Sequence, residues 1–165
     1  MHPLEEDQVA VFLREVQGHP HEYLYKIALF TGLREGEVLG LGWEHIDFQA
    51  GTLTVKRQLR REQKKGGEYY FSPPKNNKSR CLTLAPSVIQ LFRLQKLEQN
   101  SMRMEAGDAW EEHGLIFTNQ TGGYLSYRTV YDCFKRIVRN IGAPATRFHD
   151  PSHLRRCLYQ ERRRH

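Results

Sequence analysis

The hydrophobic pattern changes its period twice along this chain, and this limits the possible folds more than any other feature. Before residue 42 and after residue 85 apolar side chains recur with the helical period, which predicts helices over 4–16, 22–31, 35–41, 86–104 and 126–141. Between them lie short alternating runs, at 52–56, 57–60, 69–72 and 80–84, separated by Gly and Asn. The pattern predicts an α+β fold, mainly helical, with a small three-stranded antiparallel sheet.

Helix boundaries are marked by residues that favour them. Gly32 directly follows the second apolar run, as a helix C-cap does. Pro86 and Ser126 precede the two later helical patterns, and Gly142 stops the last one. Arg34 is therefore expected in the turn between two buried helices, where its side chain is able to leave the core.

Size and composition exclude several classes of protein. At 165 residues, with 39% hydrophobic and 27% charged residues, the chain fits one globular domain. No run approaches the roughly eighteen apolar residues of a membrane span, and the first residues do not form a secretory signal, so we expect a cytoplasmic protein without membrane contact. Three widely separated cysteines form no Cys-x-x-Cys pair, which predicts neither a disulfide framework nor a metal site.

Positive charge is concentrated at the carboxy-terminal end. The net charge is +6, and residues 147–165 carry six arginines against two acidic residues, a surplus of four. The first 146 residues therefore hold a net charge of only +2. Such a balance is compatible with a polyanionic partner, but it also serves solubility, so motifs must identify the function.

Residues 31–47 form the most informative motif, Thr-Gly-Leu-Arg-Glu-Gly-Glu-Val-Leu-Gly-Leu-Gly-Trp-Glu-His-Ile-Asp. This segment resembles the first arginine box of tyrosine recombinases, the phage integrase family. Arg34 alone would be read as a solvated arginine after a helix, but the match extends over the whole segment. The resemblance implies that Arg34 is catalytic, because a guanidinium can hold two non-bridging phosphate oxygens as negative charge develops. Glu37 is expected to support the turn and the guanidinium from behind, without acting on the phosphate itself.

Residues 73–86 resemble the family's lysine hairpin, Pro-Lys-(Thr/Asn)-x-x-Ser-x-Arg-x-(Ile/Leu)-x-Leu. The resemblance implies that Lys75 is the catalytic lysine, a general acid toward the departing 5′ hydroxyl. Lys78 competes for this role, since two asparagines could shift the turn. Lys78 and Arg80 are otherwise expected to bind DNA.

A third motif is interrupted. His149 and Asp150 match the start of the family's second arginine box, so the resemblance implies a catalytic His149, but Pro151 and Ser152 stand where Leu and the second arginine belong. Residues 151 onward can be written as all of their possible codons and then read in the frame that starts at the second base. That frame allows Leu-Arg-Thr-Tyr-Ala, which is close to the family's sequence after His-Asp. We therefore interpret residues 1–150 as an incomplete catalytic domain and residues 151–165 as a basic tail that is out of frame. Tyr159 follows too soon after the box to be an obvious nucleophile.

The resemblance implies site-specific DNA recombination or integration through a 3′-phosphotyrosine intermediate. It further implies double-stranded DNA as the partner, with no cofactor and no small-molecule substrate. Incomplete closure of the core predicts a homo-oligomer or self-association. The expected catalytic set lacks the second arginine and the nucleophile, so the alternative is a non-catalytic DNA-binding or interaction module.

Overall fold

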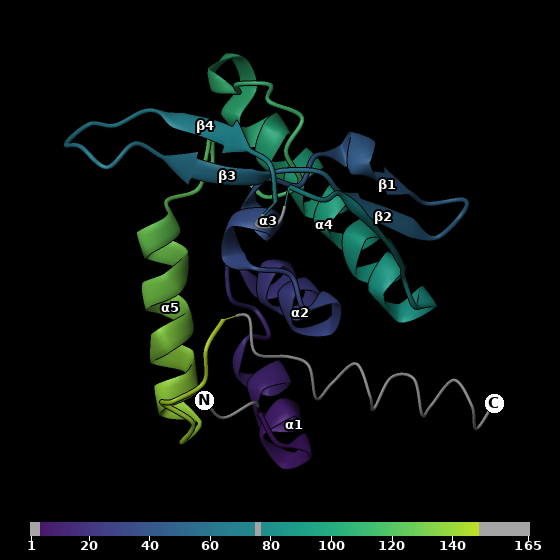
Figure 1. The fold of residues 1–165 in the computed structure, drawn as a ribbon, viewed down its shortest axis with the longest axis vertical. Coiled ribbons are helices and arrows are strands. Elements are labelled where there is room, and N and C mark those ends of the chain that lie inside the picture. Colours follow the sequence, from purple (N-terminus) through teal and green to yellow (C-terminus); the bar gives the residue numbers. More distant parts are fainter. Residues whose placement is uncertain (1–3, 75–76, 149–165) are drawn as a thin grey trace. The chain divides into compact units, whose positions relative to one another are not determined.

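A computed structural model describes residues 4–74 and 77–148 of the chain. The chain divides into two compact units (Figure 1). One combines the two ends of the chain, Met1–Glu35 with Ser126–His165, and the other is the central segment Gly36–Leu125. The sequence predicted a single domain and did not indicate this division. No helix among the described residues is both long and apolar enough to cross a membrane.

Three helices form the terminal unit: α1 (Glu6–Glu15), α2 (Glu22–Thr31) and α5 (Tyr127–Asn140). The predicted helices over 4–16, 22–31 and 126–141 are confirmed. Gly32 takes the left-handed conformation at the end of α2, with φ 72°, which a residue without Cβ adopts at little cost. Ser126 caps α5, because its hydroxyl oxygen accepts a hydrogen bond from the Thr129 amide at 3.4 Å.

Aromatic side chains fill the core of the terminal unit. The Phe134 ring of α5 lies 6.0 Å from the Phe12 ring of α1 and 6.1 Å from the Tyr25 ring of α2. The buried Tyr25 hydroxyl donates a 2.8 Å hydrogen bond to the Val130 carbonyl, so its polar end is satisfied. These contacts bind α1 and α2 to α5, although more than a hundred positions separate Tyr25 from Val130.

The central unit holds one long helix and two antiparallel sheets. Its helical elements are α3 (Glu35–Leu39), η1 (Trp43–His45), α4 (Pro86–Ala106) and η2 (Gly107–Ala109). Its strands are β1 (Ile46–Asp47), β2 (Thr52–Val55), β3 (Gln58–Arg61), β4 (Tyr69–Ser72) and β5 (Arg80–Thr83). α4 confirms the predicted helix over 86–104, and α3 is two residues shorter than the predicted 35–41.

The predicted three-stranded antiparallel sheet is present, but its membership differs from the sequence interpretation. The sheet has the order β1-β2-β5, with Leu53 of β2 opposite Ile46 on one side and Leu82 on the other. β3 and β4 pair with each other in a separate two-stranded sheet. The alternation of buried residues continues from Val55 to Leu59 although the ladder breaks between them, so the pattern alone did not reveal two sheets.

A buried glutamine joins α4 to the segment that follows α3. The Gln99 side chain accepts a 2.8 Å hydrogen bond from Trp43 Nε1 and donates to the carbonyls of Leu115 at 2.8 Å and Ile116 at 3.1 Å. Beside it, Leu115 forms an isolated antiparallel bridge with Gly42, and the Ile116 amide donates a 2.9 Å hydrogen bond to the Leu41 carbonyl. Trp43 thus has a structural role in this unit.

Candidate functional site

Arg34 lies in the three-residue connection between α2 and α3, as predicted. Its side chain is exposed, whereas Leu33 before it is 0% exposed and Glu35 after it is 8% exposed. The Thr31 hydroxyl closes the end of α2 by donating a 2.7 Å hydrogen bond to the Ile27 carbonyl. The backbone around Arg34 is therefore anchored on both sides while the guanidinium reaches solvent. Such an arrangement is able to present a fixed cation to an anionic group.

Glu37 and Arg80 form a bidentate ion pair inside the central unit. Arg80 Nη1 and Nη2 donate to the two Glu37 carboxylate oxygens at 2.6 and 2.9 Å. The Glu37 side chain is only 3% exposed and that of Arg80 is 40% exposed. The hydrogen bond to Glu37 raises the pKa of Arg80 above its ordinary value. The pair ties the first residue of β5 to α3.

This pair adds to the expectations for both residues. Glu37 was expected to support the Arg34 turn, and the structure shows that its carboxylate holds Arg80. Arg80 was expected to bind DNA, and its guanidinium is instead engaged by Glu37 on one edge. Sequence reasoning missed the partnership because the two residues are 43 positions apart. A role for Arg80 toward DNA stays a prediction.

The lysine hairpin is described only in part. Lys78 is exposed two residues before β5, and the Asn77 amide donates a 2.8 Å hydrogen bond to the Pro74 carbonyl. Asn77 has a φ of 53°, a conformation that asparagine tolerates better than most residues. Lys75 lies outside the described residues, so the choice between Lys75 and Lys78 as the catalytic lysine remains open.

His149 also lies outside the described residues, as does the 151–165 tail, but the segment leading to His149 is well anchored. Phe148 is 8% exposed, and its ring lies 5.2 Å from that of Phe134 and 6.3 Å from that of Tyr25. Lys135 Nζ of α5 donates a 2.9 Å hydrogen bond to the Thr146 carbonyl. The approach to His149 therefore packs in the terminal unit, which also contains Arg34.

Glu35 is a buried carboxylic acid that the sequence reasoning did not single out. Burial, together with the negative charge of Asp132 on α5, raises its pKa to about 8. Its Oε1 atom has no hydrogen-bond partner in the described part of the chain. Near neutral pH the acid is therefore mostly protonated, and it does not offset the positive charge of the neighbouring Arg34. Only the flanking apolar positions, Leu33 and Val38, could have indicated its burial.

Metal coordination finds no support among residues 4–74 and 77–148. In these segments the His, Cys, Asp and Glu side chains form no group of three that could hold an ion. The residues predicted to act on phosphate are instead cations and a histidine.

A model of the phage integrase family matches residues 3–158, nearly the whole chain. The chain belongs to the phage integrase family. Among curated members of this family, it is 27% identical over 158 residues to a "Tyrosine recombinase XerC-like" protein of Caldanaerobacter subterraneus subsp. tengcongensis, covering 90% of this chain and 40% of that protein. An integrase of Streptomyces ambofaciens is 31% identical over 127 residues, covering 73% of this chain and 31% of that integrase. The chain thus spans less than half the length of these two relatives.

Solved structures of integrases and recombinases share the fold. The Tn1549 transposon integrase in complex with transposon right end DNA superposes with a TM-score of 0.75 at 23% identity, covering 93% of this chain and 51% of that one. The XerH site-specific recombinase bound to palindromic difH substrate gives 0.64 at 22% identity, covering 98% of this chain and 42% of that one. The mixed helix-and-sheet architecture is therefore that of a phage integrase family catalytic domain.

Proposed function

We propose that this chain is part of an enzyme of site-specific DNA breaking and rejoining, and that double-stranded DNA is its partner. The observation that carries the proposal is Arg34, exposed between buried Leu33 and buried Glu35 within the family's first arginine box. An exposed guanidinium on a backbone flanked by buried residues suits the two non-bridging oxygens of a phosphodiester.

The chemistry follows from the residue types. In the complete reaction a tyrosine hydroxyl releases its proton to solvent and its oxygen forms a bond to phosphorus. The bond from phosphorus to the 5′ oxygen breaks, and the departing oxygen takes up a proton. Lys75 or Lys78 supplies that proton, while Arg34 and His149 stabilise the five-coordinate phosphate. The phosphotyrosyl bond keeps the energy of the phosphodiester until another 5′ hydroxyl attacks, so the reaction needs no cofactor.

We further propose that these 165 residues bind DNA without cleaving it. Ser152 stands at the position of the second arginine, and loss of one member of a cooperating catalytic set costs orders of magnitude in rate. The interpretation of residues 151–165 as an out-of-frame tail accounts for this change. Sequencing of the coding DNA tests it directly, since codons incompatible with the second frame would rule it out.

Two measurements test the proposed function. Fluorescence anisotropy with a labelled duplex should show binding whose affinity falls steeply with salt concentration. For each contacted phosphate, the logarithm of the binding constant should fall by about 0.9 for every tenfold increase in salt. A pool of nicked duplexes with randomised sequence should give no protein–DNA adduct that survives denaturing electrophoresis. An adduct that disappears in Tyr159→Phe would contradict the proposed incompleteness.

The alternative is a binding module that never had a catalytic role. Restoring the second reading frame after Asp150 in the coding DNA separates the two possibilities. If the parent gene encoded a recombinase, the restored protein should form an adduct, and Arg34→Lys should abolish it. Absence of an adduct with the restored frame would favour the non-catalytic module.

A further inference from the structure

The segment from Lys56 to Ser72, which contains β3, β4 and their connecting turn, is unusually basic. It carries six lysines and arginines against Glu62 and Glu68, a net charge of +4, while the whole chain carries +6. In Figure 1 the turn that joins β3 to β4 extends beyond the other elements of the central unit. Two stretches therefore hold the positive charge of this protein, and one of them is a projecting hairpin.

One face of the hairpin uses its cations internally. Arg57 Nε donates a 2.9 Å hydrogen bond to the Gly40 carbonyl, and its guanidinium carbon lies 3.7 Å from the centre of the Phe71 ring. Arg61 Nε donates to the Gly67 carbonyl at 2.7 Å, and its guanidinium carbon lies 4.9 Å from the Tyr69 ring. These two arginines stiffen the hairpin by stacking on its own aromatic residues.

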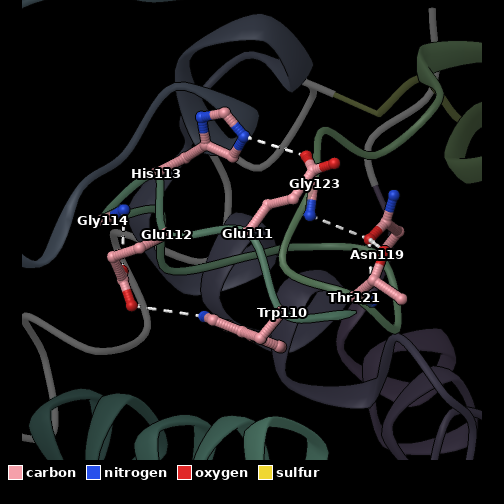
Figure 2. Close-up of polar contacts among 8 residues, drawn as sticks. All are labelled: Trp110, Glu111, Glu112, His113, Gly114, Asn119, Thr121 and Gly123. Carbon is pink, nitrogen blue, oxygen red and sulfur yellow. Dashed lines mark hydrogen bonds and ion pairs between the residues drawn. The ribbon is translucent and has the colours of Figure 1, made fainter. Parts of the chain in front are cut away.

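A hydrogen-bonded loop supports that same face. Its Tyr124 ring stacks on Tyr69 at 5.1 Å and meets the Phe71 ring edge-on at 6.2 Å. Figure 2 shows how the loop is held: the Asn119 side-chain oxygen accepts hydrogen bonds from the amides of Thr121 and Gly123, at 2.9 and 2.8 Å. The face of the hairpin that carries Tyr69 and Phe71 is therefore held in place within the central unit. The other face of the same hairpin consequently has a defined orientation in that unit.

That opposite face presents cations and an aromatic ring to solvent. Arg60 of β3 lies directly opposite Tyr70 of β4, and side chains of such a pair stand on the same side of a sheet. Both are exposed, Tyr70 by 46%, and the turn adds the exposed Lys65 and Lys64, whose Nζ lies 3.1 Å from the exposed Glu62 carboxylate. We call Arg60, Lys64, Lys65 and Tyr70 the hairpin patch.

We propose that the hairpin patch binds the phosphate backbone of duplex DNA, as a contact additional to the Arg34 region. This inference rests on the proposed function. A four-residue strand extends about 13 Å, and duplex DNA carries one charge per about 1.7 Å of its axis, so strand and turn together can reach several phosphates. The patch offers lysine, arginine and tyrosine donors to phosphate oxygens, which position a protein on DNA without reading its sequence.

Two triple variants with equal net charge test the inference. The first, Arg60→Gln with Lys64→Gln and Lys65→Gln, removes the cations of the patch. The control removes three exposed arginines from three separate helices, Arg14→Gln, Arg93→Gln and Arg139→Gln. Binding of a labelled duplex is measured by anisotropy between 50 and 300 mM NaCl, and circular dichroism verifies that each variant is folded.

The patch variant should bind at least about tenfold more weakly at 100 mM NaCl, and its salt slope should fall by about two to three. The control should weaken binding by less than about threefold. If the first variant is unfolded, the turn-only pair Lys64→Gln with Lys65→Gln replaces it, with an expected slope decrease of about one to two.

Three results would overturn the inference. Equal weakening of both triple variants would mean that net charge alone matters, and an unchanged slope for the patch variant would exclude contact; in both cases the proposed function survives. If the unmodified chain does not bind duplex DNA, the inference and the proposed function fail together.

Discussion

At the scale of single residues, the most unusual group is the Glu35 carboxylic acid. It follows Arg34 directly, yet it is buried and its pKa is raised to about 8, mainly by burial and in addition by the charge of Asp132. A charged carboxylate at this position would weaken the positive field of Arg34. The protonated acid avoids that effect at neutral pH, so burial of Glu35 keeps its own charge from offsetting that of Arg34.

Glu35 should make the stability of the fold depend on pH. The folded pKa of about 8 lies above the ordinary value of 4.5, so the folded state binds more protons between these values. The stabilisation is fully present below about pH 4.5 and is lost as the pH rises through about 8. The slope due to this group approaches about 1.4 kcal/mol per pH unit within that window.

Urea unfolding of the unmodified chain and of Glu35→Gln between pH 5 and 9 measures this contribution. The glutamine is isosteric and does not titrate, so the difference in unfolding free energy between the two proteins should shift in favour of the variant as the pH rises. A difference that stays constant from pH 5 to 9 would contradict the burial of an ionisable Glu35.

At the scale of elements, the Glu37–Arg80 pair connects two segments that the sequence analysis treated separately. It joins α3, which lies within the first arginine box, to the first residue of β5, which lies within the lysine-hairpin motif. The pair thereby fixes the position of the start of β5, two residues after Lys78, against α3 within the central unit. Its buried partner is Glu37, so removal of Arg80 leaves a desolvated carboxylate without this cation.

Arg80→Gln should therefore destabilise the chain by about 2–4 kcal/mol, whereas the double variant with Glu37→Gln should lose less than the sum of the single changes. A double-mutant cycle by urea unfolding gives the coupling energy, expected at about 1–3 kcal/mol. Lys65→Gln in the exposed turn between β3 and β4 is the control and should cost less than about 0.5 kcal/mol. Additive single effects would show that the pair contributes no specific stabilisation.

Local signals predicted the helices well because each boundary depends on adjacent residues. Gly32, Pro86 and Ser126 all mark helix ends where the sequence indicated them. Sheet membership could not be predicted in the same way, since the pairing of β2 with β5 joins Thr52 to Thr83 across a long intervening segment. The alternating pattern tells which side of a strand is buried but not which strand lies beside it.

The candidate site was predictable to a similar extent. Arg34 was placed in its turn from the motif and from Gly32, whose positive φ ends α2. The ion pair of Glu37 with Arg80 and the burial of Glu35 depend on tertiary packing, which a single sequence does not display. Lys75 and His149 lie outside the described residues, so their roles stay predictions.

At the scale of the whole molecule, the two units differ in how the sequence encodes them. The terminal unit is built from the two ends of the chain, and the central unit is one continuous segment between them. The central unit, Gly36–Leu125, contains both sheets, the Gln99 hydrogen bonds and the Glu37–Arg80 pair. The terminal unit needs both ends of the chain, because α1 and α2 pack on α5. Only the central unit is therefore encoded by one uninterrupted segment.

An isolated fragment 36–125 should fold by itself. Circular dichroism should show mixed helix and strand, and hydrogen exchange should protect the amides of Leu53 and Val55, which are 0% exposed and lie in the middle strand of the sheet. A peptide of residues 1–35 is the matched control and should stay largely unfolded, because its helices are short and lack their partner α5. An unstructured 36–125 fragment would show that the central unit depends on the chain ends.

The separation of the two sheets also has an evolutionary consequence. Since β2 pairs directly with β5, everything between Val55 and Arg80 is an excursion that the three-stranded sheet does not require. The base of this excursion is tied to the rest of the central unit, because Leu59 is buried and Arg57 bonds the Gly40 carbonyl directly after α3. The turn between β3 and β4, residues 62–68, can instead lengthen, shorten or change its charge without shifting the register of the three-stranded sheet. Insertions and charge changes are therefore expected to be tolerated in this turn, which lies outside the motifs that contain Arg34, Lys75, Lys78 and His149.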